Sequence, residues 1–346
     1  AAMSTVEEPF VEPGLDVGGG IRLRSPVGVG TNKWGVDASK YDADSLSECY
    51  RAAIAGGMTL FNTAQLYNGG ESEQCLGRLR AAEGPRPEGV IVSKFASLRC
   101  GPEGLVASLR ESLRRCQMET LDAFLVHHPR GDQRVLADQL AQAVREGLCR
   151  TVGVSNFGEA ELRRFHSLLA ERGVPLLFNE VEFSLLRRAP ETNGLIAACR
   201  ELGVTVLAWA PLASGRLTGK HTELGSPQTL ELVQALRAIG ERRGRSSSSV
   251  AINWCVCKGT VPIPGARTRE QAEENSRGAG WRLTAEEVQL LDGLASEDHG
   301  MYSSPEALYA FLGWWPRPWL RPLVSVGLRA GMSIAKVALP VQRDMA

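Results

Sequence analysis

Short apolar segments alternate with longer amphipathic segments along most of the chain. Several apolar segments, such as VIV at 90–92, have the near-continuous hydrophobicity of parallel strands buried on both faces. The predicted strands are residues 26–30, 58–61, 90–93, 122–126, 150–154, 176–181, 204–208 and 260–264. The predicted helices are residues 45–55, 71–82, 103–116, 135–146, 159–171, 192–202, 229–242 and 269–277. Eight strand–helix repeats predict an α/β fold, a closed (β/α)8 or TIM barrel.

A doubly wound open sheet is the alternative for alternating strands and helices. That fold predicts a glycine-rich GxGxxG turn after its first strand. Gly28 and Gly30 fall at the right place, but Lys33 and Trp34 follow and the third glycine is missing. The pattern therefore favours the barrel.

The hydrophobic pattern changes near the C-terminus. Three tryptophans at 314, 315 and 319 precede a segment, 320–339, in which polar residues recur every three or four positions. This spacing predicts an amphipathic helical extension that carries too much charge to span a bilayer. The extension either packs on the barrel or docks on a membrane or protein complex through residues 314–339. We expect a flexible segment at 1–20, the barrel at 21–298 and the extension at 299–346.

Composition narrows the class of partner. The 346 residues include 39 Lys and Arg against 39 Asp and Glu, so the chain has no excess positive charge to attract nucleic acid. Its eight cysteines are scattered without a CxxC pair, which favours reduced thiols and no metal site. A small molecule is the expected partner.

Polar residues follow the predicted strands at positions where a barrel places its reacting groups. Tyr67, Lys94 and His127 follow three consecutive strands. An ammonium beside a phenol stabilises the phenolate, and an imidazole can orient a carbonyl oxygen. These three residue types together indicate proton donation to a carbonyl group.

Five motifs in order carry a resemblance to a known family. They are FNTAQLY at 61–67, continuing to residue 77; VSK at 92–94; LVHHP at 125–129; GVSNF at 153–157; and PIPGART at 262–268. Together they resemble the aldo-keto reductase superfamily over residues 27–294, in its plastid or bacterial-like branch. The resemblance implies reduction of an aldehyde or ketone with NADP(H).

The resemblance also assigns roles to individual residues. Tyr67 is implied as the general acid, Lys94 as the group that tunes it, His127 as the group that positions the substrate oxygen, and Trp34 as a residue of the substrate pocket. The implied cofactor-binding residues are Ser155, Asn156, Glu180, Trp209, Gly265, Arg267, Thr268, Gln271, Glu274 and Asn275. An arginine suits a 2′-phosphate because its rigid fork meets phosphate oxygens, so Arg267 favours NADPH over NADH.

Two residues depart from the family pattern. The family usually has aspartate at the position of Asn62 and glutamine at the position of Glu180. We expect Asn62, counted among the catalytic residues, to leave Lys94 without its carboxylate partner. The pKa values of Lys94 and Tyr67 should then both fall. Glu180 could place a negative charge near the nicotinamide, or it could be protonated when buried.

These features leave two functions open. The first is an NADPH-dependent reductase of a small carbonyl compound. The second is a cofactor-binding regulatory or scaffold module with weak or no turnover, docked through the C-terminal extension. The small, polar residues at 1–5 do not resemble a secretory signal, and we expect a chloroplast or another organelle, otherwise the cytoplasm.

Overall fold

The computed structural model describes residues 14–35, 43–84, 88–96, 104–220 and 226–295. The predicted C-terminal extension, including residues 314–339, lies outside the described residues. None of the described helices is long and apolar enough to cross a membrane.

Eight parallel strands form the centre of the described chain. They are β3 (Val29–Gly30), β4 (Leu60–Asn62), β5 (Val90–Phe95), β6 (Leu121–Val126), β7 (Cys149–Ser155), β8 (Leu176–Glu182), β9 (Thr205–Trp209) and β10 (Val261–Pro262). Each strand pairs with the next in sequence order. The backbone N–H groups of Gly28 and Gly30 donate to the carbonyls of Pro262 and Pro264 at 2.9 and 3.0 Å. These bonds join the last strand to the first, so the predicted (β/α)8 barrel is confirmed.

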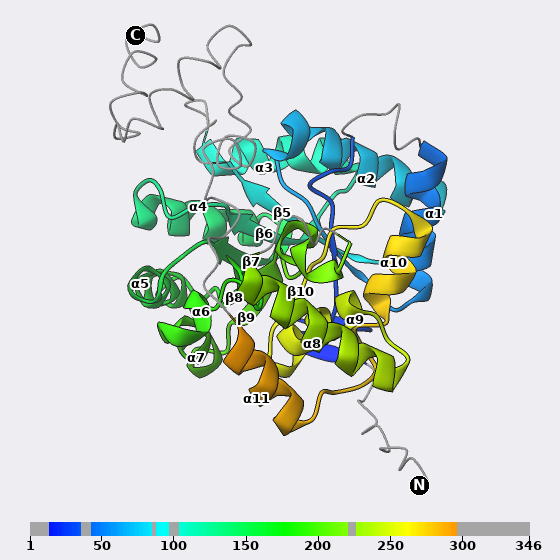
Figure 1. Cartoon of the computed structure of the whole chain (residues 1–346). Helices are drawn as coiled ribbons and strands as arrows, with labels where there is room; N and C mark the ends of the chain where they lie inside the picture. The colour runs from blue at the N-terminus through cyan, green and yellow to red at the C-terminus, as the bar shows by residue number, and fades with distance from the viewer. Residues whose placement is uncertain (1–13, 36–42, 85–87, 97–103, 221–225, 296–346) are drawn as a thin grey trace, which may run out of the picture. The chain divides into compact units, whose positions relative to one another are not determined.

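Helices surround the strands, as Figure 1 shows. The predicted helices correspond to α1 (Ala43–Ala55), α2 (Glu71–Ala82), α3 (Gly104–Cys116), α4 (Gln133–Arg145), α5 (Glu159–Ala170), α7 (Leu195–Glu201), α8 (Pro227–Arg243) and α10 (Arg269–Ser276). Four further helical segments are η1 (Tyr67–Gly70), α6 (Ala189–Thr192), η2 (Ala213–Thr218) and α11 (Ala285–Leu294). The pattern also missed α9 (Ser247–Cys257), because nearly every side chain of this helix is buried and it has no polar face.

An antiparallel hairpin of β1 (Leu15–Gly18) and β2 (Ile21–Leu23) precedes the barrel. Its turn packs against the N-terminal ends of β7 and β8: Gly19 lies against Thr151 and Leu177. Arg150 also donates to the Gly20 carbonyl at 3.2 Å. The hairpin therefore lies at the end of the barrel opposite the predicted reacting groups. The predicted boundary of a flexible segment at residue 20 falls inside this hairpin.

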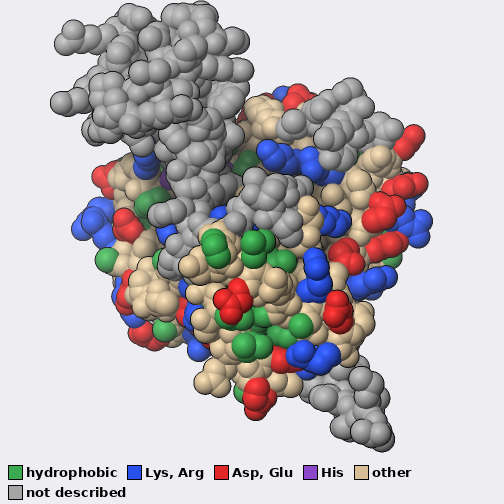
Figure 2. All heavy atoms as spheres, in the orientation of Figure 1, with side chains coloured by type: hydrophobic (Ala, Val, Ile, Leu, Met, Phe, Trp, Pro, Cys, Tyr) green, Lys and Arg blue, Asp and Glu red, His purple; other side chains and the backbone are tan. Residues whose placement is uncertain are grey.

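The core consists of strand side chains packed against the helices, and most strand positions are fully buried. Acidic and basic side chains are interspersed over the face seen in Figure 2. Asn62, Lys94 and Glu180 are polar side chains inside the barrel, and each is at most 2% exposed. Buried charges are costly unless they are paired, and these three residues form the centre of the site described next.

Candidate active site

Lys94 brings the ends of β4 and β5 together with the start of η1. Its ammonium donates to the Tyr67 hydroxyl at 3.2 Å, to the Thr63 carbonyl at 2.9 Å and to Asn62 Oδ1 at 2.7 Å. Its side chain is fully buried, so these bonds replace water around the charge. The predicted closeness of Lys94 and Tyr67 is therefore present in the structure.

Glu180 reaches the same ammonium from β8. Its carboxylate Oε1 lies 3.3 Å from Lys94 Nζ, and its Oε2 accepts a hydrogen bond from Asn62 Nδ2 at 2.6 Å. The expectation that Lys94 lacks a carboxylate partner is wrong. The carboxylate comes from a different strand, and Asn62 bridges it to the lysine.

The electrostatics of Tyr67 also differ from the expectation. Burial raises its pKa well above the ordinary value, and the negative charge of Glu180 raises it further. The predicted fall assumed a lysine charge with no nearby anion, and Glu180 removes that assumption. Tyr67 is therefore a protonated phenol at neutral pH and is available as a proton donor. Burial lowers the pKa of Lys94, while attraction to Glu180 opposes this shift.

His127 lies beside Tyr67, just after β6. The two rings meet edge to face with centroids 5.9 Å apart, and His127 stacks on His128 at 4.8 Å. Burial, helped by the charge of Lys94, holds the pKa of His127 well below its ordinary range. A neutral imidazole has one N–H donor and one acceptor nitrogen, so the ring can direct a hydrogen bond without carrying charge.

The ends of β6, β7, β8 and β9 are tied together by polar side chains. Ser155 Oγ donates to the Glu180 carbonyl at 3.1 Å. Asn156 has a left-handed backbone, with φ 61°, and its amide donates to the His127 carbonyl at 3.1 Å. The indole of Trp209 donates to Asn156 Oδ1 at 3.2 Å. These predicted cofactor residues thus lie together at one end of the barrel, beside the Tyr67–Lys94 pair.

The loop from β10 to α10 holds the other predicted cofactor residues. Thr268 caps α10 by accepting from the Gln271 N–H at 3.3 Å, and the Gln271 side chain accepts from the Arg267 N–H at 2.8 Å. Asn275 donates to the Gly265 carbonyl at 3.2 Å. These bonds shape a loop in which the partly exposed Arg267 lies at a helix N-terminus. Backbone N–H groups and the helix dipole make such a position suitable for a phosphate.

Two predicted residues make contacts that the sequence did not indicate. Glu274 accepts hydrogen bonds from Ser246 and Ser249 and so holds the start of α9. Trp34 is fully buried, and its indole donates to the Ala266 carbonyl at 2.7 Å. In the described structure Trp34 thus supports the loop after β10, and Glu274 ties α10 to the start of α9. Their roles at the adenosine end and in the substrate pocket stay predictions.

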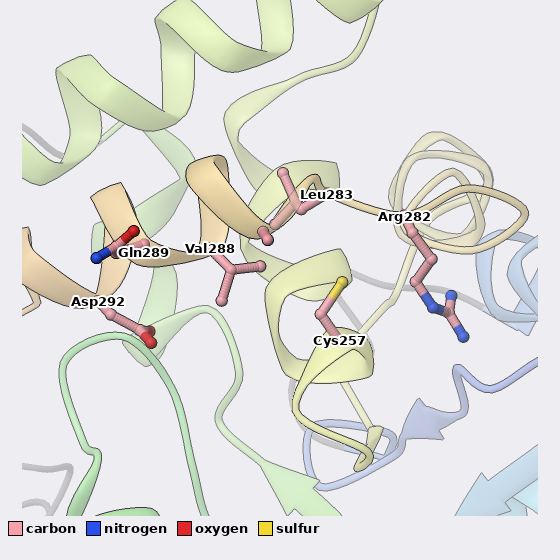
Figure 3. A pocket seen from close by; sticks show the side chains of 7 residues that line it. Cys257, Arg282, Leu283, Val288, Gln289 and Asp292 are labelled. Atoms are coloured by element: carbon pink, nitrogen blue, oxygen red, sulfur yellow. The ribbon is translucent and has the colours of Figure 1, made fainter. Parts of the chain in front are cut away.

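A surface hollow lies elsewhere, between the end of α9 and α11 (Figure 3). Cys257, Val288 and Asp292 line it. Asp292 accepts from the Trp254 indole at 2.9 Å and from Lys258 at 2.6 Å. Cys257 ends the helix that precedes the N-terminal end of β10, so the hollow is at the other end of the barrel from Tyr67. Asp292 thus takes part in structural contacts, and the hollow is separate from the site.

Sequence reasoning missed two groups of this site. One is the Thr63 carbonyl, which no side-chain pattern could reveal. The other is Glu180 as the counter-ion of Lys94. The signal for it was present, because the inward side chains of alternate barrel strands meet in layers. By strand order β4 and β8 lie on opposite sides of the barrel, so Asn62 and Glu180 could have been predicted to meet at its centre.

Comparison with known proteins agrees with this geometry. The profile described as "Aldo/keto reductase family" matches residues 26–296. The chain is 36% identical over 306 residues to a chloroplastic pyridoxal reductase of Arabidopsis thaliana, covering 79% of this chain and 84% of that protein. It is 32% identical to 2,5-diketo-D-gluconic acid reductase B of a Corynebacterium species, covering 83% and 90%.

Solved structures of aldo/keto reductases also resemble the chain. An aldo/keto reductase from Klebsiella pneumoniae in complex with NADP and acetate is 26% identical, with a TM-score of 0.70 and coverage of 84% of this chain and 98% of that one. Another from the same organism, in complex with NADPH, is 27% identical, with a TM-score of 0.68 and coverage of 78% and 90%. From the matching profile, its relatives and its barrel, the chain belongs to the aldo/keto reductase family.

Proposed function

We propose that this chain reduces an aldehyde or ketone to an alcohol with NADPH, and that Tyr67 is the general acid. The observation that carries the proposal is the contact between Lys94 Nζ and the Tyr67 hydroxyl at 3.2 Å, with the His127 ring beside it. A protonated phenol next to a buried ammonium can give up its proton, because the resulting phenolate gains an adjacent positive charge.

NADPH, when bound, would supply the hydride for the carbonyl carbon. Tyr67 gives its proton to the carbonyl oxygen as negative charge develops there, and Lys94 stabilises the phenolate. Neutral His127 directs its N–H to the same oxygen, so the oxygen is held in place before and during proton transfer.

Two groups of described residues suit the two ends of the cofactor, the nicotinamide ring and the 2′-phosphate. Asn156, Ser155 and Trp209 offer amide, hydroxyl and aromatic groups beside Tyr67, which suits a flat ring with a carboxamide. Arg267 at the N-terminus of α10 suits a 2′-phosphate. The two Klebsiella pneumoniae relatives crystallised with NADP or NADPH support this choice.

The relatives also guide the choice of substrate and location. The chloroplastic pyridoxal reductase supports testing pyridoxal, an aromatic aldehyde, and supports a plastid location for this chain. The cofactor-binding module without turnover loses its main argument, because Glu180 supplies the carboxylate that Asn62 lacks.

The test is an assay of the purified chain with NADPH and a set of carbonyl compounds: pyridoxal, an unrelated aromatic aldehyde, an aliphatic aldehyde and a ketone. NADPH consumption and alcohol formation are measured together, and cofactor binding is measured separately by fluorescence. We expect at least one compound to be reduced with one alcohol formed per NADPH consumed. Tight NADPH binding with no alcohol from any compound would contradict the proposal.

A further inference from the structure

The carboxylate of Glu180 faces two hydrogen-bond donors at once. Its Oε2 accepts from Asn62 Nδ2 at 2.6 Å, and its Oε1 lies 3.3 Å from Lys94 Nζ. Asn62 in turn accepts from Lys94 at 2.7 Å through its Oδ1. The three side chains form a closed ring in which every contact joins a donor to an acceptor.

This ring needs one carboxylate and one amide. A carboxylate offers only acceptors, whereas an amide offers one acceptor oxygen and one donor nitrogen. Two amides would set a donor against a donor at one contact. Two carboxylates would set acceptor against acceptor at 2.6 Å unless they shared a proton. The carboxylate could come from either strand, provided that the other strand supplies the amide.

We propose that Glu180 is the positioning residue for Lys94 in the reaction, and that Asn62 and Glu180 work as an exchangeable amide–carboxylate pair. Glu180 neutralises the buried ammonium from β8, and Asn62 fixes its direction, so that Lys94 points at the Tyr67 hydroxyl. This inference rests on the proposed reduction, because it concerns the group that tunes the proton donor.

Other titratable groups around Lys94 do not replace Glu180. Glu73 on α2 acts on Lys94 only at longer range, and its carboxylate is held by Arg115 at 2.5 Å and by Ser93 at 2.5 Å. Tyr67 is a protonated phenol, and His127 is a neutral imidazole. Within the described residues, Glu180 is therefore the carboxylate in direct contact with the ammonium.

The test compares Glu180→Gln, Asn62→Asp and the double variant Asn62→Asp/Glu180→Gln. Glu180→Gln removes the counter-ion, so the alkaline fall in kcat/KM should move down by about 1–3 pH units, and kcat should drop about ten-fold or more.

Asn62→Asp should not raise kcat above wild type, because the second carboxylate meets Glu180. In the double variant the ring closes again, with the carboxylate on β4 and the amide on β8. It should recover most of the loss in kcat and return the alkaline limb to within about half a pH unit of wild type.

The matched control is Asp122→Asn, which also turns a paired carboxylate into an amide. Asp122 pairs with Arg150 at 3.1 Å at the N-terminal end of β6, away from Tyr67. This variant should lower stability without moving the pH profile. If Glu180→Gln instead alters only the relative affinities for NADP and NADPH, with an unchanged pH profile, Glu180 serves the cofactor and the inference is wrong.

A second measurement does not depend on turnover. Glu180→Gln leaves Lys94 buried without its counter-ion, so its Tm should fall, and the double variant should recover most of that loss. If wild type reduces no carbonyl but the Tm pattern holds, the pairing is right and the proposed function is wrong. If the Tm of the double variant falls by the sum of the decreases in the two single variants, Asn62 and Glu180 are not an exchangeable pair, whatever the activity.

Discussion

The Asn62 amide on β4 donates to the Glu180 carboxylate on β8 at 2.6 Å, across the interior of the barrel and over 118 residues of sequence. Two departures from the expected residues thus compensate for each other. Neither departure alone predicts the charge of the site. Considered together, they retain one carboxylate beside Lys94.

The pH dependence of reduction follows from these contacts. The pKa of Tyr67 is raised, so the phenol stays protonated as the pH increases. The pKa of Lys94 is lowered by burial from its ordinary 10.5, so the ammonium is lost first. The alkaline limb of kcat/KM should therefore lie below 10.5 and report Lys94. The pH profile of wild type on one aldehyde checks this, and an activity that persists well above the ordinary lysine pKa would contradict it.

The acid side of the same profile should not report a histidine. The pKa of His127 lies well below its ordinary value because the ring is buried near Lys94, so the imidazole stays neutral as the pH falls through 6–7. The pKa of Glu180 is raised by burial, and protonation of this carboxylate should set the acid limb. An acid limb that persists in Glu180→Gln but disappears in His127→Gln would reverse this assignment.

Cofactor preference should depend on Arg267. Replacing it by alanine should weaken NADPH binding by about 1–3 kcal/mol, the scale of a charge-assisted contact, because the 2′-phosphate loses its arginine. NADH affinity should change little. The control is Arg269→Ala at the first position of α10, where the exposed side chain pairs with Glu273 at 2.7 Å. Fluorescence titration measures the affinity for each cofactor. If Arg267→Ala weakens NADPH and NADH binding equally, Arg267 does not bind the 2′-phosphate.

Packing between strands should make Gly153 intolerant of a side chain. An added Cβ on β7 would lie 2.8 Å from Phe178 Cβ and 2.9 Å from Leu125 Cγ. Gly153→Ala should therefore lower the free energy of unfolding by about 1–3 kcal/mol. Gly293→Ala in α11, where nothing lies within 4 Å of the added Cβ, is the matched control and should be neutral or stabilising by up to about 1 kcal/mol. Denaturant unfolding curves of both variants measure the free energy of unfolding, and an equal change in the two variants would contradict the packing argument.

The sequence predicted the barrel well because strand and helix periodicities alternate clearly. Its failures have physical causes. Helix α9 is buried on all sides and so has no polar stripe. The β1–β2 hairpin is short, with strands of four and three residues, too little for a periodic pattern.

The site was predictable where a residue acts from its own strand end. Tyr67, Lys94 and His127 follow consecutive strands, and the structure brings them together. The charge balance was not predicted, because Glu180 was considered only as a cofactor contact. Its contact with Lys94 joins β8 to β5, which are three places apart in the strand order and are not neighbours in the sheet.

The proton-donor role of Tyr67 is tested by a single-turnover measurement on the chain saturated with NADPH, comparing wild type with Tyr67→Phe on an aldehyde that wild type reduces. Tyr50→Phe is the matched control, because the Tyr50 hydroxyl donates to the Glu88 carbonyl at 2.8 Å, away from Lys94. Tyr67→Phe should slow reduction by about 10²–10⁴-fold, with NADPH affinity nearly unchanged, while Tyr50→Phe should keep the wild-type rate. Reduction by Tyr67→Phe at the wild-type rate would show that this tyrosine is not the proton donor.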